Sequence, residues 1–180
     1  MYINVHNHTD RSILDAAQTM EDILDWSVEH EIPAVCTTDH GSIWGAPSFY
    51  KTCKSQNITY VPGTELYVRM PVLDRALARD KDRSEIIKSK KPYRHCVLLA
   101  RNNTGYSNLM KILSKAYEDY YYSPNVPWHF ILEHAEGLMC TTACLGGLFA
   151  KDFIVTKCEP DPNVICQRKE DIVKAIGEAK

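Results

Sequence analysis

The sequence predicts an α/β fold within a single domain. Short apolar or β-branched runs alternate at least four times with segments whose apolar residues recur every three or four positions, and this alternation favours a mostly parallel sheet or a barrel. The length of 180 residues is sufficient for one hydrophobic core. Apolar residues make up 44% of the chain and charged residues 24%, a composition that is typical of globular proteins and excludes wholesale disorder.

Three features of the sequence indicate where the protein works and what it can contact. No run of 18 apolar residues occurs, and the N-terminus lacks a charged flank followed by an apolar stretch, so we expect neither a membrane span nor a secretory signal. The seven cysteines are odd in number and form no Cys-x-x-Cys pair, which indicates free thiols in a reducing, cytoplasmic setting. The 21 basic and 23 acidic residues give a net charge of −2, so any contact with nucleic acid must be local.

The first 70 residues predict three strands and two helices. Thr19 followed by Asp22 matches an N-terminal capping arrangement, and the apolar residues after it recur at helical spacing until Pro33 ends the helix. Pro47 fits the first turn of the second helix, and Pro62-Gly63 predicts a break in the third strand. The expected elements are a strand over 2–6, a helix over 20–28, a strand over 34–38, a helix over 45–56 and a strand over 58–68.

The second half of the chain begins with a basic segment. Residues 74–94 contain eight basic and four acidic residues and few apolar ones, so we expect a mobile excursion from the core. The continuous apolar run over 96–100 is typical of a strand that is covered on both faces. The expected elements are a strand over 96–100, a helix over 104–117, a tyrosine-rich loop over 120–124, a short helix over 127–132, a strand over 138–142 and a helix over 172–179.

Histidines follow the first two predicted strands. His6 and His8 are two residues apart at the end of the first strand, so their imidazoles share a face and can reach one ion. Asp39 and His40 end the second strand in the same way, and Gly41 allows a sharp turn there. Active sites of α/β barrels are built at this end of the strands. Either pair alone could equally be surface polar residues, but two such pairs indicate a site.

Three further side chains fall at matching places. Glu65 lies within the third strand, His95 opens the fourth, and Cys144 follows the fifth. Each has a simpler explanation: Glu65 as a solvated edge residue, His95 as a polar residue at a strand start, and Cys144 as a small core residue. Taken together, His, Asp, Glu and Cys at five strands favour a multinuclear site for Zn²⁺, Mn²⁺ or Fe²⁺.

The remaining histidines and several cysteines fit structural roles better. No strand-end geometry surrounds the three other histidines, which are His30, His129 and His134. Three cysteines fall inside predicted strands, where we expect them in the core: Cys36, Cys96 and Cys140.

Several sequence blocks together resemble a known family. VHNHTDRSILDAA, TTDHGSIWGAPSFYKTCK, GTELYV, RHCVLLARNNTGYSNLMKILSKAY and EGLMCTTACLGG are similar, in collinear order, to the PHP (polymerase and histidinol phosphatase) domain, especially the version at the N-terminus of bacterial DNA polymerase III alpha subunits. The resemblance implies a distorted (β/α)7 barrel with up to three divalent metal ions. We expect the PHP core over 1–150 and an extension over 151–180 leading into the rest of the domain or polymerase.

The resemblance also implies a ligand set, which includes Asp15, a residue that its spacing alone does not single out. The family's last motif, an Asp-x-His pair, is absent after Cys144, so we expect a barrel that is incomplete at its C-terminus, with two of the three ions each lacking one ligand. The implied metal ligands are His6, His8, Asp15, His40, Glu65, His95 and Cys144, and the implied catalytic residues are Glu65, His6, His8 and His40.

Two classes of function follow from the resemblance. One is metal-dependent phosphoester hydrolysis, as a 3′–5′ exonuclease within a replicative DNA polymerase, either as a fragment or as a short bacterial or phage version. The other is a non-catalytic module that braces the polymerase or binds a proofreading exonuclease subunit; a stand-alone PHP phosphatase is a further alternative. The resemblance implies that the chain contacts DNA as part of the full polymerase, and we expect no binding to a membrane. Without the Asp-x-His pair, we expect the 180 residues alone to be weak or inactive.

Overall fold

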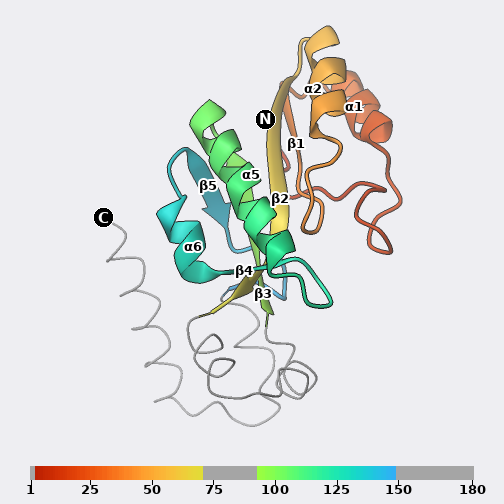
Figure 1. Cartoon of the computed structure of the whole chain (residues 1–180). Helices are drawn as coiled ribbons and strands as arrows, with labels where there is room; N and C mark the ends of the chain where they lie inside the picture. Colours follow the sequence, from red (N-terminus) through yellow and green to blue (C-terminus); the bar gives the residue numbers. More distant parts are fainter. Residues whose placement is uncertain (1–2, 71–92, 149–180) are drawn as a thin grey trace, which may run out of the picture.

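The computed structural model describes residues 3–70 and 93–148 (Figure 1). The predicted helix over 172–179 and most of the predicted excursion over 74–94 lie outside these residues, whereas Tyr93 and Arg94 already belong to a strand. In chain order the elements are α1 (Met20–Glu29), β1 (Ala34–Thr37), α2 (Ala46–Ser55), β2 (Thr59–Arg69), β3 (Tyr93–Ala100), α5 (Asn103–Glu118), β4 (Asn125–Pro127), α6 (Trp128–Glu133) and β5 (Leu138–Thr141).

The sheet confirms the α/β class, but its strand directions are mixed. Its order is β1-β2-β3-β5, with β4 paired to β2. The β1 and β4 strands run parallel to β2, whereas β3 runs antiparallel to both β2 and β5. The expectation of a mostly parallel sheet is therefore wrong for the described residues, although a mixed sheet is consistent with a distorted barrel.

The apolar run in β3 explains why direction could not be inferred from the sequence. Cys96 and Leu98 pack on one face of the sheet in the same core as Leu109 and Ile112 of α5. Val97, on the opposite face, packs in a second core with other residues. A continuous apolar run thus reports that both faces are buried, and an antiparallel strand satisfies that condition as well as a parallel one.

Strand β2 is continuous, so the predicted break at Pro62-Gly63 is wrong. Residues 59–62 pair with β1, and from Gly63 onward the strand pairs with β3. A Cβ on Gly63 would lie 2.4 Å from Leu99 Cδ2 and 2.7 Å from the Leu98 carbonyl oxygen, so only glycine fits at this crossing. The Pro-Gly pair therefore marks a change of partner along one long strand.

Two helical layers cover the sheet at different places. Helices α1 and α2 lie beside β1, where Ile23, Val35 and Phe49 form one core, whereas α5 lies across β2 and β3 (Figure 1). Helix α1 begins with the predicted capping box, in which the Thr19 hydroxyl accepts from the Asp22 N–H. Among the described residues, none of the helices combines the length and hydropathy that a membrane crossing requires.

The residues before α1 are irregular, so the predicted strand over 2–6 is wrong for the residues described. Asparagine side chains bind the backbone here: the Asn4 carboxamide oxygen accepts from the His6 N–H at 3.1 Å. Such local bonds compete with a strand ladder. The segment nevertheless runs beside β1, because the Asn7 carbonyl accepts from the Thr38 N–H at 2.7 Å.

Candidate metal centre

The structure brings the side chains of all seven sequence-predicted residues to one place. They arrive from four parts of the fold: the irregular N-terminal segment, the loop after β1, the adjacent strands β2 and β3, and the loop after β5. Because β3 is antiparallel to β2, its beginning lies beside the later half of β2. The candidate metal centre comprises His6, His8, Asp15, His40, Glu65, His95 and Cys144.

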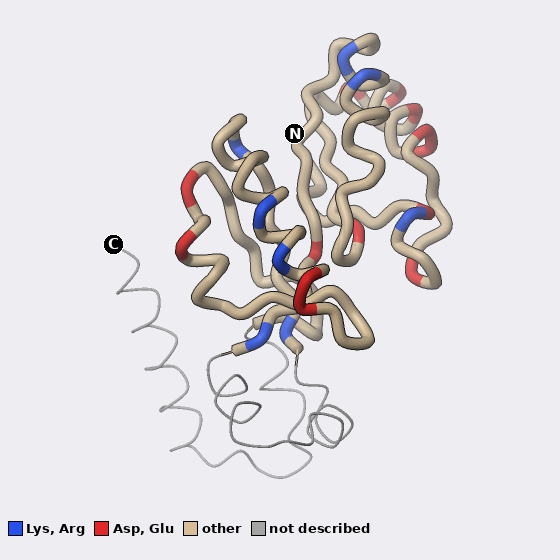
Figure 2. Tube along the Cα trace, in the orientation of Figure 1, with Lys and Arg blue, Asp and Glu red and all other residues tan. Residues whose placement is uncertain are grey.

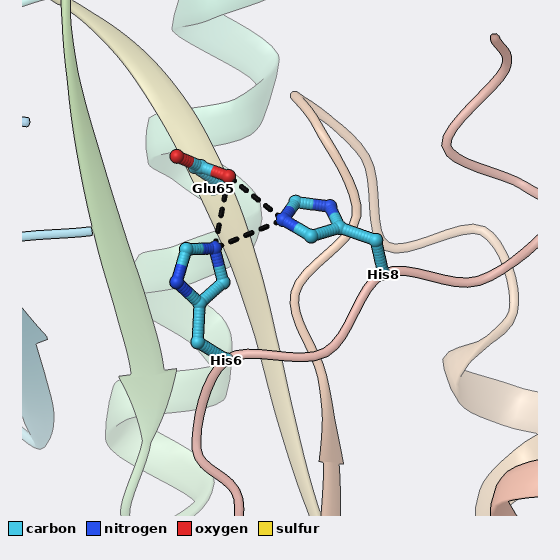
Figure 3. Close-up of side chains that lie close together, drawn as sticks. All are labelled: His6, His8 and Glu65. Atoms are coloured by element: carbon cyan, nitrogen blue, oxygen red, sulfur yellow. Dashed lines mark hydrogen bonds and ion pairs between the residues drawn. The ribbon is translucent and has the colours of Figure 1, made fainter. Parts of the chain in front are cut away.

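Glu65 is at the middle of this group. Its Oε2 atom lies 3.0 Å from His6 Nε2 and 2.9 Å from His8 Nε2 (Figure 3). The same oxygen is 3.6 Å from His40 Nε2, and Oε1 is 2.9 Å from His95 Nδ1. The side chain is only 1% exposed. Burial opposes ionisation of Glu65, but the bonds from His8, His95 and His6 outweigh it and hold the carboxyl pKa far below its usual range.

The arrangement of nitrogens fits a metal ion better than a hydrogen-bond network. His6 Nε2 and His8 Nε2 lie 2.9 Å apart while both face the same Glu65 oxygen. If both nitrogens carry protons, the two N–H groups oppose each other, and if neither does, two lone pairs face a carboxylate. If only one does, its single N–H is shared between the other nitrogen and the Glu65 oxygen. A cation among them satisfies all three atoms. Imidazole and carboxylate donors are the set that Zn²⁺, Mn²⁺ and Fe²⁺ accept.

Three overlapping groups of donor atoms share this arrangement. Within each group the ligand atoms all lie within 4.8 Å of one another. Neighbouring groups have members in common: His8 belongs to two groups, as do His40 and Glu65. The groups are His6, His8 and Glu65; His8, Asp15 and His40; and His40, Glu65 and His95. Each group thus shares one member with each of the other two, and the donors form one compact cluster.

The surroundings shift the pKa values of His8 and His40 in opposite directions. Burial opposes the charged form of His8, but its hydrogen bond to Glu65 and the charges of Glu65 and Asp15 outweigh this and raise its pKa. Burial lowers the pKa of His40, and the neighbouring His8 and His95 add to this effect. A neutral imidazole presents a free lone pair, which is the form that binds a metal.

Asp15 joins the group through Ser12, a residue that sequence reasoning missed. Asp15 Oδ2 is 3.2 Å from His8 Nδ1 and 3.7 Å from His40 Nε2. The Ser12 hydroxyl donates to Asp15 Oδ2 at 3.2 Å and accepts from the His40 N–H at 3.2 Å. Ser12 is 2% exposed. Ser12 therefore links the N-terminal segment to the loop after β1 by hydrogen bonds. No sequence pattern predicts this role.

Asp39 is placed differently from its neighbour His40. Its buried carboxylate accepts from the Thr9 N–H at 2.6 Å and from the Thr9 hydroxyl at 2.8 Å. Thr9 follows His8 directly. Asp39 and His40 thus have different roles. His40 belongs to the candidate metal centre, whereas Asp39 holds the segment that carries His6 and His8.

Cys144 approaches the candidate metal centre from the side of His95. Its Sγ atom lies 3.4 Å from His95 Nδ1 and accepts from the Gly146 N–H at 3.3 Å. The His95 N–H in turn donates to the Gly146 carbonyl at 2.9 Å. Partial burial raises the pKa of the Cys144 thiol, and the negative charge of Glu65 adds to the rise. A bound cation would reverse this effect, because a metal deprotonates a coordinating thiol.

Tyr67 is a second residue that sequence reasoning missed. Its ring stacks on His40 with centroids 5.4 Å apart and meets His95 edge-on at 5.0 Å. Tyr67 lies two residues after Glu65 in β2, so both side chains project from the same face of the strand. That spacing was visible in the sequence. The ring supports two of the imidazoles and restricts their orientation.

His30 and His134 lie outside the candidate metal centre, and each bonds a backbone carbonyl, which fits the structural role expected of them. His30 bonds the Trp26 carbonyl through Nδ1 at 2.8 Å, and His134 bonds the Phe130 carbonyl at 3.0 Å. Cys36 and Cys96 are buried as expected. Cys140 is exposed, so its predicted place in the core is wrong: β5 pairs with β3 along one side only in the described sheet.

Comparison with known proteins gives the family. Residues 4–180 match the PHP domain family. Proteins named DNA polymerase III subunit alpha are 38% identical over 151 residues in Chlamydia trachomatis, covering 83% of this chain and 12% of that protein, and 35% identical over 165 residues in Borreliella burgdorferi, covering 91% and 14%. An amidohydrolase structure from Chromobacterium violaceum gives a TM-score of 0.38 at 18% identity, covering 64% of this chain and 34% of that one. The chain belongs to the PHP domain family.

Proposed function

We propose that the chain is the PHP domain of a bacterial or phage DNA polymerase III alpha subunit, and that it binds divalent metal ions which serve phosphoester hydrolysis. The observation that carries the proposal is Glu65, a buried carboxylate in contact with four imidazoles. A cation would be shared by the imidazole nitrogens and the carboxylate at once, whereas a proton is shared by one pair of atoms at a time. The residues proposed to hold up to three ions are His6, His8, Asp15, His40, Glu65, His95 and Cys144.

Divalent ions supply two effects in this chemistry: they lower the pKa of a bound water, and they stabilise negative charge on the attacking and leaving oxygens. The chain's own residues provide the fixed frame. Glu65 holds four histidines in one orientation, Ser12 orients Asp15, and Tyr67 limits the movement of His40. We assign the catalytic role to Glu65, His6, His8 and His40 because the Nε2 atoms of these three histidines all face the same Glu65 oxygen, Oε2, at 2.9–3.6 Å. Zn²⁺, Mn²⁺ and Fe²⁺ suit this set.

The proposed substrate is DNA, in a 3′–5′ exonuclease reaction. Support comes from the relatives, whose names are those of a DNA polymerase subunit. The chain spans only 12–14% of their length, so most of the contact with DNA is proposed to come from the rest of such a polymerase. Charge is unevenly placed on the domain: α1 carries only acidic charges, whereas Lys111 and Lys115 lie along α5 (Figure 2). Leu66 packs in the core beneath α5, so its neighbour Glu65 faces the opposite side of β2, and the lysines of α5 lie away from the candidate metal centre.

Metal content is the first test. The chain, purified without chelators, should contain at least one equivalent of a transition metal, and Glu65→Gln should lose most of it. The matched control is Glu133→Gln, which removes an exposed carboxylate on α6. Less than a tenth of an equivalent in the unaltered chain, after supplementation with Zn²⁺ and Mn²⁺, would overturn the proposal.

Turnover is the second test, measured as release of 3′-terminal nucleotides from a labelled DNA primer with Mn²⁺ present. The release should be slow, because no Asp-x-His pair follows Cys144, but it should exceed that of Glu65→Gln and stop with chelator. Equal release by the unaltered chain and by Glu65→Gln would contradict the proposal that this site hydrolyses DNA. If metal is bound without turnover, the domain instead braces the polymerase or docks a proofreading exonuclease subunit.

A further inference from the structure

Two cysteine sulfurs meet outside the candidate metal centre. Cys96 Sγ on β3 and Cys140 Sγ on β5 are 3.2 Å apart. Cys140 pairs directly with Leu98, so Cys96 is its diagonal neighbour on the same face of the sheet. A disulfide bond is about 2.05 Å long, so the sulfurs need to approach by only about 1.2 Å to bond.

The two thiols differ in their access to solvent. Cys96 is fully buried in the core that α5 covers, whereas Cys140 is exposed. A dissolved oxidant can therefore reach Cys140 first, and Cys96 only through it. The other cysteines within residues 3–70 and 93–148 lack this arrangement: Cys36 Sγ donates to the Asn4 carbonyl, Cys53 is fully buried, and Cys144 Sγ contacts His95 Nδ1.

We propose that Cys96 and Cys140 form a reversible redox pair, which small-molecule disulfides such as oxidised glutathione convert into a protein disulfide. The Cys140 thiol loses its proton, and its sulfur attacks one sulfur of oxidised glutathione, which breaks that S–S bond and releases one glutathione thiol. The Cys96 sulfur, also deprotonated, then attacks Cys140 in the mixed disulfide and releases the second. Two protein thiols are oxidised by two electrons, one glutathione disulfide is reduced, and the two protons end on the glutathione sulfurs.

The position of the pair favours a labile disulfide over a permanent one. Diagonal neighbours in a sheet are separated by about 7–8 Å between Cα atoms, at or beyond the range that disulfides prefer. The bond must therefore draw β3 and β5 together, and strained disulfides are the readily reduced ones. Residue His95 precedes Cys96, and Cys144 follows β5, so closure would also shift these residues. That last consequence rests on the proposed function, whereas the redox chemistry does not.

The test uses the whole chain after removal of metal, so its result does not depend on metal binding. The protein is incubated with excess oxidised or reduced glutathione, its free thiols are alkylated, and it is digested with trypsin. Cleavage after Arg94 and Arg101 releases Cys96 alone on the peptide 95–101. Oxidised glutathione should decrease alkylation of this peptide at least tenfold and link it to the peptide that contains Cys140. Reduced glutathione should restore alkylation, and Cys53 should remain unlinked throughout.

Variants identify the partner, because trypsin leaves Cys140 and Cys144 on one peptide. The link should persist in Cys144→Ser and disappear in Cys140→Ser, a change at an exposed position that folding tolerates. Absence of the link in the unaltered chain, its loss in Cys144→Ser, or its survival in Cys140→Ser would each overturn the proposal. Failure of metal binding alone would leave this outcome unaffected, so the two proposals are tested separately.

Discussion

His6, His8 and Asp15 reach the candidate metal centre from an irregular segment, residues 3–18, whereas Glu65 and His95 reach it from paired strands. Strands β2 and β3 pair along seven residues and pack in the core beneath α5. Within the part of the chain that the structure describes, the N-terminal segment has no strand partner and is held chiefly by side-chain bonds, among them those between Thr9 and Asp39. Glu65 and His95 are therefore held by the sheet, whereas the positions of His6, His8 and Asp15 depend on a few polar contacts. A bound ion would join the two.

The largest expected effect comes from the residue that contacts both regions. Glu65→Gln keeps the shape of the side chain but removes the negative charge that faces His6 and His8 from one side and His95 from the other. Metal affinity, measured by titration with Zn²⁺ or Mn²⁺, should fall by at least about 100-fold. Mutation of residues that only hydrogen-bond to metal ligands already lowers metal affinity by about 10–100-fold, and loss of a ligand should lower it by more. Glu133→Gln should leave the affinity unchanged. A loss below tenfold would mean that the two regions bind metal independently.

Metal removal should affect the two regions unequally. A ligand that binds only the folded state stabilises it by about 2.7 kcal/mol at a free concentration 100 times its Kd, so chelation should lower the melting temperature. Amide hydrogen exchange should accelerate most in residues 3–18, while β2 and β3 keep their protection, because their ladder does not need the ion. Equal acceleration in both regions would contradict the difference in how they are built.

Thr9→Val tests the contact that holds the N-terminal segment without touching the donor atoms. The change keeps the shape of the side chain, removes the hydroxyl that donates to Asp39 Oδ2 at 2.8 Å, and leaves a buried carboxylate oxygen without that partner. The expected cost is about 1–2 kcal/mol in the free energy of unfolding, measured by urea denaturation. Exchange should increase most in residues 3–18. Thr52→Val, at an exposed position on α2, is the control and should change neither quantity measurably.

The comparison also shows what the sequence could predict. His6 and His8 are only two residues apart, so the sequence predicted that their imidazoles would lie close together. They do lie close together, although the segment that carries them is not a strand. Glu65 was identifiable because a carboxylate inside an apolar strand needs partners. Asp15 was indicated only by family resemblance, because its contact with His8 depends on a loop held by Ser12. Such contacts, like the direction of β3, depend on tertiary packing that local patterns do not encode.

The smallest expected effect lies on the strand side alone. The Arg69 guanidinium, at the end of β2, donates to Asp119 Oδ2 at 2.8 Å, and Lys115 donates to Oδ1 at 3.0 Å. Partial burial opposes ionisation of Asp119, but these two partners outweigh it and lower the carboxyl pKa below its ordinary 3.8. The ionised form therefore stabilises the fold at pH values above 3.8, and this contribution is lost as the pH falls through the lower pKa of the folded protein.

Asp119→Asn measures that contribution directly. At pH 7 the variant should be less stable by about 0.5–1 kcal/mol, since the pair is partly exposed and screened by solvent. The difference from the unaltered chain should shrink as the pH is lowered through the range in which Asp119 gains its proton, which urea denaturation at several pH values would show. Because Asp119 contacts β2 and not residues 3–18, exchange in the N-terminal segment should be the same in both proteins. A change there would mean that the end of β2 and the irregular segment are coupled through Glu65 even without a bound ion, and the two regions would then behave as one.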